Sequence, residues 1–258
     1  MRLAWLVTGL MLLAAPATGQ EGARIVGQGG GELRLERVVG EVIQPGVTRF
    51  AEAAEALPAA MDRLCTAPSE GALAGARGAF ARIVVSHAQI EWIRIGPLVE
   101  DNRLERLLFW PDRKGIALRQ VQAVLAEEDA TALDPAQLGQ KSVAVQGLTA
   151  LEFVLYGTGS EALAAGEGAF RCRFGLAIAE QMSVLANAVA SGWSAPDGIA
   201  GRLLEPQDSN ADYRTRLEAV EEIIGIVSQG VEGIKDQRLL PFIARDDAAA
   251  KPKQALFW

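Results

Sequence analysis

Hydrophobic residues beyond residue 46 recur at steps of three and four, which is the spacing of one face of an α-helix. Few stretches show the strict alternation of a half-buried β-strand, and none of useful length follows residue 46. The chain is therefore predicted to be all-α, built from antiparallel helices packed as bundles. Helices are predicted over residues 47–65, 73–96, 103–111 (a short helix or turn), 115–129, 135–156, 166–193 and 211–237.

Proline and glycine mark the expected ends of these helices. Pro58 is expected to kink or divide the first helix, because proline lacks the N–H that an inner turn needs. Gly96-Pro97 should stop the second. Asp134-Pro135 has the order of a cap followed by a first-turn proline, which should open one long helix ending at Gly157.

The first 46 residues lack this helical pattern. Residues 1–19 contain one basic residue, an apolar run from Leu3 to Ala15 and small residues near the end, as in a signal peptide that is cleaved after export. An uncleaved membrane anchor is the alternative, although the run is short for a span of about 20 residues. Residues 20–46 are predicted to form a loose N-terminal arm, with one strand or helical turn as an option.

The remaining chain divides by composition. Residues 47–193 should form one helical bundle, and the Pro/Gly-rich stretch 194–210 is predicted to be a hinge or loop. Residues 211–258 would begin a second helical unit. The last three residues, Leu-Phe-Trp, are typical of the start of a further buried segment, so this second bundle is expected to be incomplete.

Charge and cysteine content limit the possible partners. The chain has 25 basic and 32 acidic residues, and loss of Arg2 with the signal leaves a net charge of −8. Such an acidic chain without a basic stripe is not expected to bind nucleic acid, and the mature chain is not expected to span a membrane. Its only cysteines, Cys65 and Cys172, could form one disulfide after export, or stay two separate buried thiols.

Two groups of polar residues could carry chemistry. His87 is the only histidine, and it lies four residues before Glu91, which lies three before Arg94. On one helix face these would form an ion-pair cluster or half of a metal site, although a lone histidine is more often simply packed.

The second group surrounds Glu152, the only charged residue between Lys141 and Glu161. An isolated carboxylate in a helical core costs several kcal/mol, so it needs a partner or a pocket. Residues 146, 149, 152 and 156 would share one edge of the predicted helix, where they could form a satisfied network or hold a cation. They are Gln146, Thr149, Glu152 and Tyr156.

The segment around Glu152, VQGLTALEFVLYG, resembles the signature of the imelysin family, whose hallmark is Gly-x-His-x-x-Glu. Gly147 and Glu152 match this hallmark, but Thr149 stands at the histidine position and cannot supply a nitrogen ligand. Further similar blocks occur in the expected order: LCTAPS (64–69), IEWIRIGP (90–97), LLFWPDRKG (107–115) and FRCRFGLAIAEQM (170–182).

The resemblance implies an exported helical protein with two bundle domains, of a family associated with insulin-cleaving metallopeptidases and bacterial iron uptake. We expect a non-catalytic binding protein of the periplasm or cell envelope that handles iron or another divalent cation, with an envelope protein as partner. A metallopeptidase is the first alternative, although about three metal ligands are hard to assemble with one histidine. A degenerate scaffold that binds a protein is the second. The metal candidates are Glu152, Glu91 and His87, and the expected pocket adds Gln146, Gly147, Thr149, Tyr156, Arg94, Trp110 and Pro111.

Overall fold

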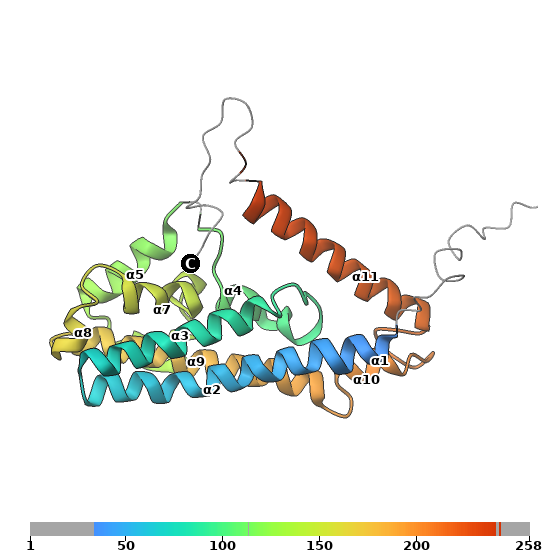
Figure 1. The fold of residues 1–258 in the computed structure, drawn as a ribbon, viewed down its shortest axis with the longest axis horizontal. Coiled ribbons are helices and arrows are strands. Elements are labelled where there is room, and N and C mark those ends of the chain that lie inside the picture. Colours follow the sequence, from blue (N-terminus) through green and yellow to red (C-terminus); the bar gives the residue numbers. More distant parts are fainter. Residues whose placement is uncertain (1–33, 113, 241–242, 244–258) are drawn as a thin grey trace, which may run out of the picture. The chain divides into compact units, whose positions relative to one another are not determined.

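The computed structural model describes residues 34–112, 114–240 and 243. Within these residues the secondary structure is helical and contains no strand (Figure 1). The all-α prediction is therefore confirmed. The residues predicted to form the signal peptide, most of the predicted N-terminal arm and the apolar C-terminal residues lie outside the described residues, and the expected domain boundaries stay predictions.

Three helices form the core. They are α2 (Gln44–Thr66), α3 (Glu70–Ala88) and α9 (Ala169–Ser194), and α2 packs against both of the others (Figure 1). Phe50, Met61 and Phe174 are fully buried, and a side chain of this size stabilises a fold by about 1.5–3 kcal/mol when buried. Helix α2 continues through Pro58, so this proline does not divide it.

A disulfide joins two of these core helices. Cys65 lies at the end of α2 and Cys172 near the start of α9, and their sulfur atoms are 2.07 Å apart. The bond confirms the predicted pairing over the alternative of two free thiols. Because it links the end of one helix to the start of the other, α2 and α9 run antiparallel.

The end of the predicted N-terminal arm is helical. Helix α1 (Leu35–Arg37) and a π-helix, η2 (Val38–Ile43), lead directly into α2. Leu35, Val39 and Ile43, four residues apart, are fully buried. The expectation of a loose arm is thus wrong for residues 35–43, because these three side chains give the segment an apolar helical face.

The predicted helix 73–96 is too long, because α3 ends at Ala88. The backbone then turns, and the carbonyl of His87 accepts hydrogen bonds from the N–H groups of both Ile90 and Glu91 at 2.9 Å. Glu91 therefore lies in the turn after α3 rather than on the helix, although it lines the same cavity as His87. Short 3-10 helices, η3 (Gly96–Leu98) and η4 (Glu100–Asn102), lead to α4 (Arg103–Leu107).

The predicted long helix 135–156 consists of three pieces. Asp134 caps the first as expected, since its Oδ1 accepts from the N–H groups of Ala136 and Gln137. However, Gly147 has a left-handed backbone with φ +66°, and Gln146 is extended, so the chain breaks before the last piece. The pieces are α6 (Pro135–Leu138), η6 (Val143–Val145) and α7 (Gly147–Tyr156). Helix α5 (Ile116–Glu127), η5 (Ala130–Leu133) and α8 (Ala162–Ala165) complete this region.

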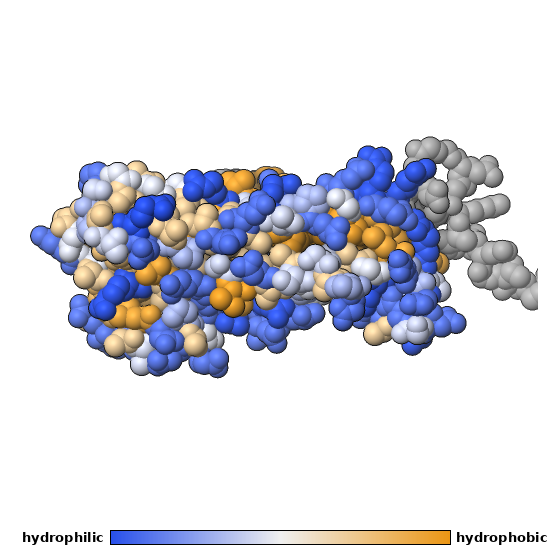
Figure 2. Space-filling model, turned by 90° about the horizontal axis from the view of Figure 1, so that it is seen from below, coloured by the Kyte–Doolittle hydropathy of each residue, from blue (hydrophilic) through white to orange (hydrophobic). Residues whose placement is uncertain are grey.

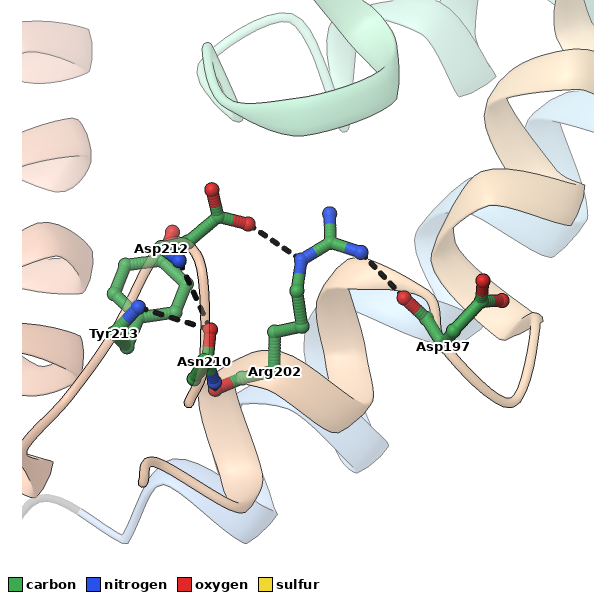
Figure 3. A network of polar contacts seen from close by, with 5 residues as sticks. All are labelled: Asp197, Arg202, Asn210, Asp212 and Tyr213. Carbon is green, nitrogen blue, oxygen red and sulfur yellow. Dashed lines mark hydrogen bonds and ion pairs between the residues drawn. The ribbon is translucent and has the colours of Figure 1, made fainter. Parts of the chain in front are cut away.

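The predicted hinge 194–210 contains a short helix, α10 (Ile199–Leu204). Figure 3 shows that the Arg202 guanidinium bridges the side chain of Asp212 and the carbonyl of Asp197. Asn210 donates to the Arg202 carbonyl at 2.8 Å, which ties the loop back onto α10.

Helix α11 (Arg216–Gly233) follows this loop and continues into a π-helix, η7 (Ile234–Leu239). Its start carries a capping box, in which Thr215 and Glu218 satisfy each other's backbone N–H groups. Residues of α11 and η7 form one wall of a cavity described below.

Apolar side chains on the face shown in Figure 2 lie in separate patches among polar ones. The described residues include one helical stretch, 169–204, that is long and apolar enough to cross a membrane. Of its apolar window, 56% is buried inside the protein. A helix in the core of a protein can have the same length and apolar composition, and the burial of this stretch indicates such a core helix.

Candidate functional site

The position of hallmark helix α7 depends on its first residue. A Cβ added at Gly147 would lie 2.3 Å from the carbonyl oxygen of Arg106 and 2.4 Å from that of Leu107. Only glycine permits this close approach to α4 together with a left-handed backbone. The glycine of the hallmark thus sets where α7, and the carboxylate it carries, lies against α4.

Glu152 lines a cavity of about 360 Å³, which we call the Glu152 cavity, together with Asp112, Leu118, Thr149 and Tyr156. Glu152 is half-buried, and among the described residues its carboxylate has no hydrogen bond or ion pair. Burial raises the pKa of Glu152 to about 7. Near neutral pH this carboxyl group is therefore close to half protonated.

The polar neighbours of Glu152 bond elsewhere. Thr149 donates its hydroxyl to the carbonyl of Phe109 at 3.1 Å, and Tyr156 reaches the carbonyl of Arg77 at 3.5 Å. The two oxygens of Asp112 accept from the N–H groups that begin α5, at 2.6 and 2.9 Å. These contacts hold the rim of the cavity in place without compensating the Glu152 charge.

Gln146 does not line this cavity. Its side chain is fully buried, its Oε1 accepts from Arg106 at 3.3 Å, and its Nε2 donates to the carbonyl of Lys141 at 2.8 Å. The predicted polar edge is therefore split: Thr149, Glu152 and Tyr156 line one cavity, whereas Gln146 braces the turn before α7.

A second cavity, of about 240 Å³, lies between the turn after α3, the α4 region and the α11–η7 segment. We call it the tryptophan cavity, because Trp92 and Trp110 both line it. Glu91 receives bonds from Arg238 on both oxygens at 3.0 Å, and the Arg238 guanidinium lies 4.5 Å from the centre of the Trp110 ring.

His87 is the most deeply buried polar side chain of the tryptophan cavity, at 2% exposure. Its Nε2 has no hydrogen-bond partner among the described residues, and its ring packs edge-on against Phe50. Burial, followed by the positive charges of Arg238 and Arg94, lowers the pKa of His87 to about 4. The imidazole is therefore neutral at pH 7.

The structure thus divides the expected pocket between two cavities. Glu152, Thr149 and Tyr156 line the first, and Glu91, His87, Arg94, Trp110 and Pro111 line the second. Sequence reasoning missed Asp112, although it lies within the noted block 107–115. It also missed Arg238, which is 147 residues from its partner Glu91 and carries no local signal.

The side chains that could act as metal ligands limit the kind of metal site that this protein can form. Among residues 34–112, 114–240 and 243, no three His, Cys, Asp or Glu side chains are grouped to hold a metal ion. The metal candidates Glu152 and His87 line different cavities. The described side chains therefore do not fit a resident metal of the three-ligand catalytic type.

These features define a class of protein: a helical protein in which a hallmark glycine positions the helix that carries Glu152 against a cavity. The model of the imelysin family, peptidase family M75, matches residues 43–256, so the chain belongs to the imelysin family. No curated protein sequence matches the chain.

A solved structure shares the fold. It is an imelysin-like protein from Psychrobacter arcticum 273-4, with a TM-score of 0.66 and 20% sequence identity. The match covers 81% of this chain and 62% of that protein, so the chain spans less than two thirds of its length. At this identity the likeness shows the fold alone.

Proposed function

We propose that this imelysin-family chain is an exported, non-catalytic binding protein that acquires or handles iron or another divalent cation. Its binding site is the Glu152 cavity. The observation that carries the proposal is the half-buried Glu152 carboxylate, which has no partner among the described residues although it faces a cavity. The cation is cargo rather than a resident cofactor.

The chemistry of the cavity suits a hard cation. Carboxylate, hydroxyl and carbonyl oxygens are the donors that such cations prefer, and the cavity offers Glu152, Asp112, Thr149 and Tyr156. A bound cation would supply the positive charge that Glu152 lacks. Because the Glu152 pKa is raised to about 7, binding near neutral pH would also release a proton.

The residue at the hallmark histidine position supports a binding role over peptidase activity. Thr149 offers no nitrogen ligand, and its hydroxyl already donates to the Phe109 carbonyl. A catalytic metal centre for peptide hydrolysis commonly uses three protein ligands and an activated water. The Glu152 cavity supplies two carboxylates and no histidine.

Export to the periplasm or cell envelope rests on the signal-like residues 1–19 and is supported by the disulfide, since such bonds persist in oxidising compartments. We also propose a role in metal uptake with an envelope protein as partner, because the imelysin family is associated with bacterial iron uptake.

Metal titration tests the proposed site. Full-length protein purified without a tag is titrated calorimetrically with Mn²⁺ and, without oxygen, with Fe²⁺. We expect one equivalent to bind, Glu152→Gln to abolish binding, and Glu167→Gln, an exposed control, to retain it. Unchanged binding by Glu152→Gln, or no binding by the wild type, contradicts the proposal.

Two further measurements separate the proposal from its alternatives. Thr149→His restores the hallmark and should increase affinity for Zn²⁺, because it adds a nitrogen ligand one turn from Glu152. Chelator-sensitive cleavage of an unstructured peptide by the wild type would instead favour the metallopeptidase. Export is checked by N-terminal sequencing of material from the periplasmic fraction, which should start after residue 19.

A further inference from the structure

The tryptophan cavity has no role in the proposed cation site. Its walls combine apolar surface from Trp92, Leu104, Leu108 and Trp110 with a comparable share of polar and charged side chains. Small-molecule sites likewise combine apolar walls with polar groups that fix the orientation of the ligand. Its volume of about 240 Å³ is below the range typical of drug-sized ligands, so its ligand must be small.

The formal charges that line this cavity cancel in number, with two carboxylates (Glu91 and Glu105) and two guanidinium groups (Arg94 and Arg238), but only one pair is joined. Glu91 and Arg238 neutralise each other through their ion pair. Arg94 is exposed, and its Nε donates a weak hydrogen bond of 3.4 Å to the carbonyl of Glu91. Glu105 also lines the cavity, yet no ion pair joins it to Arg94 among the described residues. Arg94 and Glu105, both exposed, are thus each left without an ion pair among the described residues.

The field at the buried end of the cavity is positive. His87 lies there, and the two charged groups that act on its pKa are Arg238 and Arg94, both of which lower it. A cation would be repelled from this position, whereas an anion would be attracted. The neutral imidazole adds one hydrogen-bonding atom, Nε2, that lacks a partner among the described residues although it is fully buried.

We infer that the tryptophan cavity binds a small organic carboxylate with a flat apolar skeleton. Arg94 is the counter-ion of the carboxylate, the tryptophan and leucine side chains cover the skeleton, and His87 supplies a neutral hydrogen-bonding group. The charge requirement separates this site from the Glu152 cavity, where an uncompensated carboxylate favours a cation. The two sites can therefore be tested independently.

Benzoate is a suitable probe, and benzamide is its neutral isostere. Calorimetry is performed on full-length, untagged protein in excess chelator at pH 7. We expect benzoate to bind at least about tenfold more tightly than benzamide, because a charge-assisted hydrogen bond is lost with the neutral ligand. Arg94→Gln should weaken benzoate binding by a similar factor. Arg82→Gln, which changes another exposed arginine of the same region, should bind normally.

The location of the probe can be read directly, because His87 is the only histidine in the chain and its ring protons are unambiguous by NMR. Benzoate should shift these signals in the wild type and in Glu152→Gln alike. The inference is overturned if benzoate at about 10 mM does not bind, if benzamide binds equally well, if Arg94→Gln has no effect, or if the His87 signals do not move.

Discussion

Two glutamates in this protein, Glu91 and Glu152, are both partly buried, but only Glu91 has a charge partner among the described residues. Glu91 lies in the turn after α3, and both of its oxygens bind Arg238. Glu152 lies on α7, faces a cavity of about 360 Å³ and has no partner among the described residues. Burial accordingly raises the pKa of Glu152 to about 7. The difference shows that a compensated carboxylate can serve as structure, whereas an uncompensated one is available to a ligand.

The largest effect is expected from Gly147→Ala, which would displace the helix that carries Glu152. The added Cβ would meet two carbonyl oxygens of α4 at 2.3 and 2.4 Å. We expect the free energy of unfolding to fall by about 3–5 kcal/mol, as measured by urea denaturation. Gly75→Ala is the control, because that exposed glycine of α3 has nothing within 4 Å. It should raise stability slightly, and equal effects of both changes would refute this role of Gly147.

Arg238→Met would make Glu91 resemble Glu152. The two side chains are 23% and 21% exposed, so Glu91 would be left largely buried without its charge partner. We expect a loss of about 2 kcal/mol in the free energy of unfolding at pH 7. The double variant Glu91→Gln/Arg238→Met should recover most of this loss. If it does not, the effect comes from the packing of Arg238 on Trp110.

The pH dependence of stability isolates Glu152. Its pKa is raised from 4.5 in the unfolded chain to about 7 in the folded protein, so the folded state holds the proton more tightly. The contribution of Glu152 to stability is therefore greatest below pH 4.5 and is lost as the pH rises through about 7. We expect Glu152→Gln to be about 1–2 kcal/mol more stable than wild type at pH 8 without metal, after allowance for solvent screening. Less stable protein at pH 8 would mean that the carboxylate has a partner.

Thr149→Val should have the smallest effect. It removes the hydroxyl that donates to Phe109 but keeps the shape of the side chain. We expect a loss of about 1 kcal/mol, while Thr149→Ser, which keeps the donor, should lose less. A loss of metal binding without a loss of stability would show instead that the hydroxyl is a ligand.

The sequence was sufficient for the fold class and the family, and it offered the disulfide as one of two alternatives for Cys65 and Cys172. Helical spacing and the ordered blocks are local features, and only two cysteines were available to pair. It failed where tertiary contacts override spacing: the break at Gly147 is set by the carbonyls of α4, and it removes Gln146 from the edge shared by Thr149 and Glu152. Likewise, no local pattern could show that Arg238 would meet Glu91.

The most direct test of the account is the titration of Glu152 itself. The carboxyl carbons of glutamate are followed by ¹³C NMR from pH 3 to pH 9 in metal-free protein, and Glu152→Gln assigns the signal by its absence. We expect a midpoint of about 7, moving down when Mg²⁺ is added. A midpoint near the ordinary value of 4.5 would contradict the claim that this carboxylate is buried and uncompensated.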